Sequence, residues 1–379
     1  MTQLKQDSGG ALSGCKVIDL SRVLGGPYCT QILGDHGAEV FKIEPPSGDE
    51  TRAWGPPFLD GTASYFLGVN RNKYGLSLDL SQPDGQAFLR TLLQDADVLV
   101  ENFKPGTLEK WGLGTDMLQK QFPRLVHCRI SGFGADGPLG GLPGYDACAQ
   151  AMCGLMSVNG EGDGAPTRVG LPVVDMVTGL NAALAILLAI NERQRSGKGQ
   201  FLDITLFDCA ISLLHPHAAN YFLSGKIPQR TGNAHPNIAP YESFPTRDGE
   251  IFLAVGNNRQ FELLSKVLEQ PSLASDERFQ SNAHRLKNRQ ELHVLLTGFL
   301  KEHTASDLAQ TLLKAGVPAA PVLNVGELLN HPHTRHRGMV IEDGAYRAIA
   351  SPIKLSRTPA SLRLLPPSFG QHNGKISKA

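Results

Sequence analysis

One carboxylate, Asp175, stands at the start of a long apolar stretch, where it could act on an acyl group. Leucine, alanine and isoleucine dominate as far as residue 190, and Arg193, Arg195 and Gly197 follow. This pattern predicts one buried helix with Asp175 as its N-cap and a glycine at its end. Because the helix dipole favours negative charge at an N-terminus, we expect Asp175 to stay ionised at neutral pH. A poorly hydrated carboxylate can attack an acyl carbon, so Asp175 is the candidate nucleophile, although capping alone would also explain it.

Two other patterns could carry chemistry. Gly132, Gly134 and Gly137 match the G-x-G-x-x-G spacing of dinucleotide-binding loops and follow a predicted strand. Pro138 and the Gly-rich residues after it cannot form the helix that would hold a pyrophosphate, so this segment is interpreted as a loop at the end of a strand. His331, His333 and His336 lie close together, but Pro332 interrupts their spacing and no carboxylate cluster accompanies them. The sequence therefore predicts no metal site.

The composition limits the class of protein. A chain of 379 residues with 41% hydrophobic content is long enough for one or two folded domains. Lys plus Arg and Asp plus Glu both number 36, so nothing favours binding to nucleic acid or to an anionic membrane. The apolar run at 182–190 is too short to cross a bilayer, residues 1–8 contain no apolar signal core, and no Cys-x-x-Cys pair occurs. We expect a cytoplasmic protein with reduced thiols.

Short β-type runs alternate with helical stretches in the first half of the chain, which predicts a parallel sheet with crossover helices. We expect strands at 17–20, 39–43, 76–80, 98–100, 125–130 and 200–206, and helices that include 31–36 and 85–94. The residues rich in Gly, Pro, Asn and His at 223–240 indicate a linker or loop. A smaller module is expected at 241–325, with a strand at 250–255 and helices near 260–269 and 289–303.

Several segments, in one consistent order, resemble the family III CoA-transferases. They are residues 18–27, 33–45, 69–73, 100–106, 130–134, 169–179 with 197–200, and 370–372. The resemblance implies an α/β fold, with a Rossmann-like large domain built on a parallel sheet and a smaller α+β domain. The large domain would comprise residues 10–222, with 326–379 as a linker and a return to it. The resemblance also implies an interlocked homodimer, and makes the aspartate at position 175 the nucleophile that forms acyl-enzyme anhydrides.

The same resemblance implies acyl-CoA and a carboxylic acid as substrates, with no permanently bound cofactor. CoA is expected to contact Val23, Leu24 and Gly25 along its pantetheine arm, and Lys73, Asn102, Phe103 and Lys110 at its adenine and phosphate end. Residues 22–24, 49–58, 218–221 and 256–258 are most similar to succinyl-CoA-dependent glutarate and hydroxymethylglutarate transferases. The resemblance therefore implies that the acceptor is a small dicarboxylate. Leu24 and Pro45 replace the glutamine and arginine of the oxalate-using formyl transferases, which argues against oxalate.

The second carboxylate of a dicarboxylate needs a cation or several donors once it is removed from water. The candidates are Arg22, Arg52, Tyr145, Arg168, His235 and Asn237, the last two in a loop that by resemblance covers the acyl intermediate. Two alternative functions remain. One is an enzyme similar to α-methylacyl-CoA racemase, which uses a Gly-His-Asp triplet where this chain has Gly144, Tyr145 and Asp146. The other is a catalytically inactive CoA-binding protein.

Overall fold

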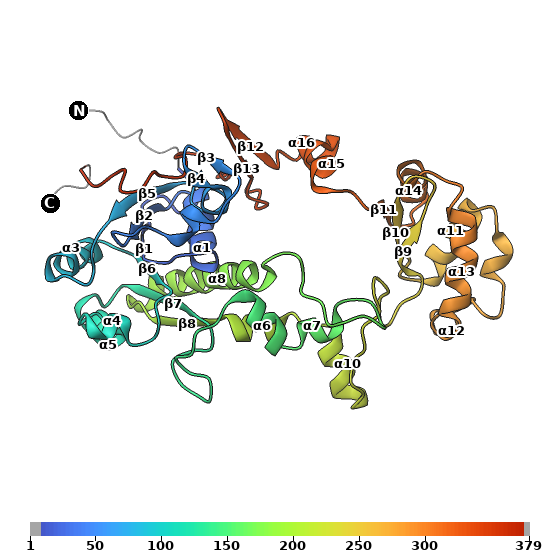
Figure 1. Cartoon of the computed structure of the whole chain (residues 1–379), viewed down its shortest axis with the longest axis horizontal. Helices are drawn as coiled ribbons and strands as arrows, with labels where there is room; N and C mark the ends of the chain where they lie inside the picture. The colour runs from blue at the N-terminus through green and yellow to red at the C-terminus, as the bar shows by residue number, and fades with distance from the viewer. Residues whose placement is uncertain (1–8, 375–379) are drawn as a thin grey trace. The chain divides into compact units, whose positions relative to one another are not determined.

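The computed structural model describes residues 9–374, which form two units with separate hydrophobic cores (Figure 1). Unit 1 contains the described residues up to Leu155, Val169–Ala218, and residues 333–374. Unit 2 contains Met156–Arg168 and Ala219–Pro332. Residues 1–8, where the sequence shows no signal core, lie outside the described residues.

Unit 1 is built on a parallel six-stranded sheet with the order β5-β2-β1-β6-β7-β8. The strands are β1 (Lys16–Asp19), β2 (Glu39–Glu44), β5 (Lys73–Ser77), β6 (Val98–Glu101), β7 (Val126–Ser131) and β8 (Phe201–Thr205). The chain runs outward from β1 to β5 and then crosses to β6 on the other side of β1. This is the order of the doubly wound nucleotide-binding folds, in which ligands bind beyond the carboxyl ends of the strands at the point of reversal.

Helices cover both faces of this sheet, which confirms the predicted α/β class. The helices of unit 1 are α1 (Gly25–Asp35), α2 (Ser64–Leu67), α3 (Pro83–Gln94), α4 (Thr107–Lys110), α5 (Thr115–Gln121), α6 (Asp146–Met152), α8 (Val173–Ser196) and α9 (Leu206–Ser212). Two more helices, α7 (Leu155–Val158) and α10 (His217–Ser224), begin in unit 1 and belong mostly to unit 2. Successive side chains of a strand point to opposite faces. Val17 accordingly packs in the cluster with α1 and α8, and Ile18 packs in the cluster with α3, α4 and α5.

Helix α8 ends as predicted, because Gly197 takes the left-handed conformation with φ of 73°. The prediction that α8 is buried was wrong for one of its faces: Leu180, Leu184, Leu187 and Leu188 are exposed. By length and composition α8 could span a bilayer. Its other face nevertheless packs against α1 and the sheet, so in this structure it is a core helix of unit 1.

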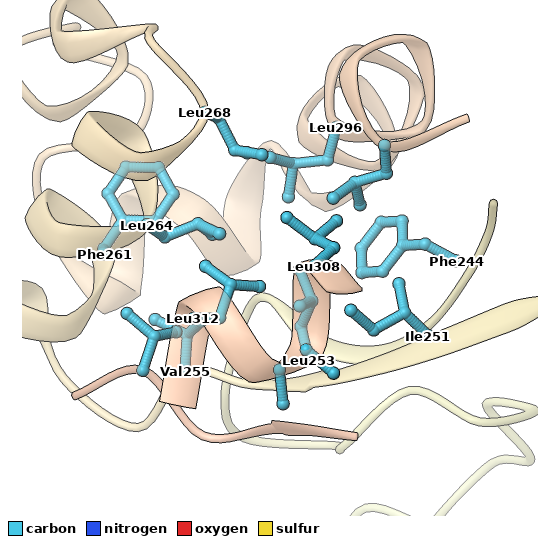
Figure 2. Close-up of a cluster of buried hydrophobic side chains, with 14 of the residues drawn as sticks. Phe244, Ile251, Leu253, Val255, Phe261, Leu264, Leu268, Leu296, Leu308 and Leu312 are labelled. Carbon is cyan, nitrogen blue, oxygen red and sulfur yellow. The ribbon is translucent and has the colours of Figure 1, made fainter. Parts of the chain in front are cut away.

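Unit 2 combines a three-stranded antiparallel sheet, in the order β11-β10-β9, with a layer of helices. Its elements are β9 (Tyr241–Pro245), β10 (Glu250–Ala254), α11 (Asn258–Val267), α12 (Asn282–Lys287), α13 (Arg289–Leu300), α14 (Ala305–Lys314), β11 (Ala319–Pro321) and α15 (Val325–Asn330). Figure 2 shows its core, where Phe244, Ile251 and Leu253 from the strands meet leucines of α11, α13 and α14. This is the smaller α+β domain that was expected.

The boundaries of the units differ from those expected from the sequence. Residues Met156–Arg168 belong to unit 2, where Gly160 accepts a backbone hydrogen bond from Gly232 at 3.0 Å. The chain returns to unit 1 at His333, through α16 (Pro332–His336) and the hairpin of β12 (Val340–Asp343) and β13 (Tyr346–Ile349). There the carbonyl of Ile349 accepts a hydrogen bond from Arg71 at 2.9 Å.

Candidate active site

The loops that follow β1, β6 and β7 surround a cavity of about 300 Å³. Its walls are residues 22–26 after β1, 102–105 after β6, 130–132 at the end of β7, and 142–145, together with Glu50, Asp175 and Leu206. The cavity therefore lies beyond the carboxyl ends of the strands, where the strand order reverses between β1 and β6. This is the place at which a doubly wound fold binds its ligands.

Asp175 reaches the cavity from the first turn of α8. The helix begins at Val173 after Pro172 in the N-cap, so the prediction that Asp175 is the N-cap was wrong. The cap comes from Asp146, whose Oδ2 accepts the backbone N–H groups of Val174 at 2.8 Å and Asp175 at 3.1 Å. Asp146 precedes Asp175 by 29 positions, so no local sequence pattern could reveal this contact.

Gln150 holds the capping carboxylate in place. Its Nε2 donates to Oδ1 of Asp146 at 2.6 Å, and its Oε1 accepts the N–H of Val169 at 2.9 Å. Both ends of the segment from Val169 to Asp175 are thus tied to α6. The nucleophile candidate stands on a fixed turn rather than on a free loop.

Burial, and after it the negative charge of Asp146, raises the pKa of Asp175 from 3.8 to about 7. Asp175 is therefore only partly ionised at neutral pH, whereas the helix dipole was expected to keep it ionised. Asp146 binds the N–H groups that would otherwise have stabilised a charge on Asp175. Near neutral pH the protonated and ionised forms coexist, and the ionised form is poorly solvated and therefore reactive.

Glycines allow α1 and α8 to approach closely beside Asp175. A Cβ on Gly25 would lie 3.4 Å from both the main-chain oxygen and Oδ1 of Asp175. A Cβ on Gly179 would lie 2.6 Å from the carbonyl oxygen of Gly25, a contact that would force the helices apart. Glycine at these positions brings the wall of residues 22–26 against the candidate nucleophile.

Most of the residues expected to contact CoA border the cavity. These are Val23, Leu24, Gly25, Asn102 and Phe103. The ring of Phe103 is supported edge-on by Trp111, with 5.3 Å between ring centroids. Lys110, in contrast, is exposed at the end of α4 and is not part of the cavity wall. Lys104 lines the cavity instead; its motif, residues 100–106, was recognised in the sequence, but Lys104 was not singled out.

Lys73 has no exposed surface. Its Nζ lies 3.1 Å from Oδ2 of Asp19 and donates to the carbonyl of Pro27 and to Oδ1 of Asn70, each at 2.9 Å. Burial lowers the pKa of Lys73 to about 8. We assign Lys73 a structural role that fixes the first turn of α1, in place of the phosphate contact expected from the resemblance.

The residues expected to bind the second carboxylate of a dicarboxylate lie in different parts of the structure. Arg22 and Tyr145 line the cavity. Arg52 does not, because its Nε and Nη2 bind the two carboxylate oxygens of Glu44 at 2.8 and 2.7 Å. Arg168, His235 and Asn237 belong to unit 2, where Nδ1 of His235 accepts the backbone N–H of Asn237 at 3.0 Å.

Tyr65, on α2, is not part of the cavity wall, but it lies near Asp175 and Asp146 and was not singled out in the sequence. Burial, and then the charges of Asp175 and Asp146, raise the pKa of Tyr65 to about 12. Its phenol therefore stays protonated and lies near enough to respond to both carboxylates. No motif in the sequence marked it, because only the folded chain brings α2 to this end of the sheet.

The comparisons with known proteins agree with this site and fold. The sequence model of CoA-transferase family III matches residues 12–373, and the chain belongs to that family. The chain is 40% identical over 377 residues to succinate–glutarate CoA-transferase of Agrobacterium fabrum, which covers 96% of this chain and 94% of the relative. It is 38% identical over 378 residues to succinyl-CoA:glutarate CoA-transferase of Mus musculus, and this match covers 98% of this chain and 87% of the relative.

Among solved structures, the chain is similar to a CaiB/BaiF family protein from Brucella suis. The TM-score is 0.88 at 42% sequence identity, over 97% of this chain and 98% of that chain. The resemblance drawn from the motifs is confirmed, as is the fold that it implied.

Proposed function

We propose that this protein transfers CoA from succinyl-CoA to a small dicarboxylate, with Asp175 as the group that carries the acyl chain and then CoA. The placement of Asp175 carries the proposal: a partly buried carboxyl group opens onto the cavity at the β1–β6 reversal of a family III chain. The substrate class rests on relatives named for succinate or succinyl-CoA and glutarate, at 40% and 38% identity over nearly the whole chain.

The first half of the reaction charges the enzyme with CoA. A carboxylate oxygen of Asp175 attacks the thioester carbon, and the C–S bond breaks with its electron pair leaving on the CoA thiolate. This gives a mixed anhydride between Asp175 and the donor acid. The thiolate then attacks Cγ of Asp175, which releases the donor as its carboxylate and leaves an aspartyl-CoA thioester.

The second half repeats these steps with the acceptor. An acceptor carboxylate oxygen attacks Cγ of Asp175 and displaces the thiolate, which forms a second anhydride. The thiolate attacks the acyl carbon of the acceptor, and the product thioester leaves with Asp175 as a free carboxylate. An anhydride retains the free energy of the thioester, whereas an ester on a hydroxyl side chain would lose it. Exclusion of water from these intermediates is a reason to expect that a loop closes, with the linker and loop at 223–240 as the candidate.

The racemase alternative is less well supported by the residues at the site. Proton exchange beside a thioester needs a second acid–base group with a pKa near neutrality. In the triplet Gly144, Tyr145 and Asp146 the position of that group is occupied by Tyr145, and a phenol is a much weaker acid than the imidazolium of histidine. Asp146 is occupied in capping α8. The inactive-protein alternative requires that Asp175 has no chemical role.

We also propose that the protein acts as an interlocked homodimer in the cytoplasm. Leu180, Leu184, Leu187 and Leu188 lie on one face of α8 and are 45%, 55%, 40% and 61% exposed. A contiguous apolar face of this kind is usually covered by a partner. Sedimentation at micromolar concentration should give a dimer, and a stable monomer would contradict this part of the proposal.

A CoA-exchange assay with a panel of acids tests the function. Succinyl-CoA is expected to be a better donor than acetyl-, butyryl- or benzoyl-CoA, and glutarate a better acceptor than monocarboxylates. A monocarboxylyl donor that is superior by about tenfold in kcat/KM would end the dicarboxylate assignment but leave the transferase chemistry intact. Exchange of α-hydrogen with solvent, without CoA transfer, would favour the racemase.

A further inference from the structure

Val23 has a backbone conformation that its side chain disfavours. Its φ is 71°, in the left-handed region, where a β-branched residue is a rare and strained exception. Glycine takes this conformation without steric cost. Such strain persists only where the surrounding structure enforces it. Val23 lies between β1 and α1, in the wall of the cavity that Asp175 enters.

The side-chain amide of Asn102 binds the residue before Val23 on both of its backbone groups. Oδ1 of Asn102 accepts the N–H of Arg22 at 2.9 Å, and Nδ2 of Asn102 donates to the carbonyl of Arg22 at 2.8 Å. The amide thus makes the pair of hydrogen bonds to Arg22 that the backbone of a neighbouring β-strand would make. It joins the loop after β6 to the loop after β1 across 80 positions of sequence.

The residues around this clamp are also fixed. Lys42 is fully buried and paired with Asp49 at 2.9 Å, and its Nζ donates to the carbonyl of Ser21 at 2.9 Å. On the other side of Val23, the carbonyl of Leu24 accepts the N–H of Tyr28 at 2.8 Å as α1 begins. Val23 is therefore the turning point between two immobilised segments.

We propose that Asn102 is a positioning residue for the transfer reaction, because its clamp on Arg22 holds Val23 in the left-handed turn that sets Gly25 against Asp175. The inference rests on the proposed function and adds a residue that acts through the backbone. A rival account is a direct hydrogen bond from Asn102 to CoA. The two accounts differ in one respect: only the clamp makes the effect of Asn102 depend on whether residue 23 has a Cβ.

A double-mutant cycle tests this dependence. Asn102→Ala is made in three backgrounds: the natural chain, Val23→Gly and Val23→Ala. The readouts are kcat and KM for CoA exchange, the affinity for CoA by calorimetry, and thermal unfolding. Val23→Ala is the matched control, because it also removes the isopropyl group but keeps a Cβ that opposes positive φ.

In the natural chain, Asn102→Ala should lower kcat/KM by about 100-fold, since a small displacement of the reacting groups has an effect of this size. The loss should stay about the same in Val23→Ala and fall below about tenfold in Val23→Gly. An equal loss in all three backgrounds would overturn the proposal. If Asn102→Ala does not fold, Asn102→Asp, which keeps the acceptor and loses the donor, enters the same cycle with the same expectation.

The calorimetric arm separates this inference from the proposed function. Should no acid support exchange while the affinity for CoA shows the same dependence on residue 23, the transferase assignment fails and the clamp stands. If CoA exchange occurs, but the effects of the substitutions at Asn102 and Val23 are additive on both kcat/KM and the affinity for CoA, the clamp is disproved and the transferase assignment stands.

Discussion

The carboxylate of Asp146 accepts the backbone N–H of Asp175 at 3.1 Å, so two acidic residues meet at the N-terminus of α8. The same oxygen binds the N–H of Val174 at 2.8 Å. Asp146 therefore has the position that a helix dipole stabilises, whereas burial and the charge of Asp146 raise the pKa of Asp175. The relationship sets the protonation of the candidate nucleophile.

Replacement of Asp146 by Asn tests that relationship. Asn keeps one oxygen that can accept the helix N–H groups, but it removes the charge that helps to raise the pKa of Asp175 to about 7. Because Asp175 attacks only when it is ionised, the rate should rise with pH through this pKa. In Asp146→Asn the rising limb should move to lower pH by roughly half a unit or more. The measurement is kcat/KM for CoA exchange from about pH 5 to 9.

The control for this prediction is Asp146→Ala, which also removes the cap and should destabilise the fold by about 1 kcal/mol. If the rising limb stays at the same pH in both variants while exchange continues, Asp146 does not control the ionisation of Asp175.

The raised pKa of Asp175 also makes stability depend on pH. The unfolded chain holds this group near 3.8 and the folded chain near 7, so the folded state retains a proton over that interval. Ionisation then disfavours the fold, and stability attributable to protonated Asp175 is lost as the pH rises from about 4 to 7. Asp175→Asn should be more stable than the natural protein above about pH 7, by on the order of 2 kcal/mol after allowance for partial exposure. Urea unfolding at several pH values measures this difference in the free energy of unfolding, which should vanish at about pH 4. A difference that stays constant with pH would show that folding does not raise the pKa of Asp175.

Lys104 and Lys110 form a natural pair for comparison. Lys104 lines the cavity, whereas Lys110 is exposed outside its wall. If Lys104 binds a phosphate of CoA, Lys104→Ala should raise KM for acyl-CoA by roughly five- to tenfold, with little change in kcat, because a charge-assisted contact is lost. The effect should shrink at high salt. Lys110→Ala serves as the control with nearly unchanged KM, and the reverse order of effects would show that CoA lies elsewhere.

Lys73 should contribute to the stability of the fold rather than to the binding of CoA. Lys73→Met leaves the carboxylate of Asp19 buried without its partner, and such a loss typically costs about 3–5 kcal/mol. Replacing both residues, as Lys73→Met with Asp19→Asn, should recover part of that stability. Thermal and urea unfolding give the comparison. A variant of normal stability with a raised KM for acyl-CoA would restore the phosphate-binding role.

The sequence was sufficient to predict the class of fold because short β-type runs alternate with helical stretches in the first half of the chain. Helices cover the strands on both faces: Val17 and Ile18 belong to different helical layers, since successive side chains of a strand point to opposite faces. The start of α1 was missed: a helix was expected from residue 31, but it begins at Gly25. Glycines and a proline usually indicate a loop, yet here they allow the helix to approach α8.

Within the site, the local pattern together with the family resemblance was enough to propose Asp175 but not to predict its surroundings. Asp146, Tyr65 and the clamp of Asn102 on Arg22 all act across long stretches of sequence, so no window along the chain contains both partners. Lys73 was misjudged for a related reason. A lysine in a sequence looks solvent-exposed, and only the packed sheet shows that Asp19 neutralises it inside the protein.

The most direct test of the central claim is to trap the covalent enzyme. Hydroxylamine added during turnover with succinyl-CoA should convert the activated carboxyl of Asp175 to a hydroxamate. Peptide mass spectrometry should locate that modification at Asp175, and neither Asp175→Ala nor the natural protein without acyl-CoA should carry it. Sustained CoA exchange by the natural protein with no modified Asp175, or near-normal exchange by Asp175→Ala, would contradict the account.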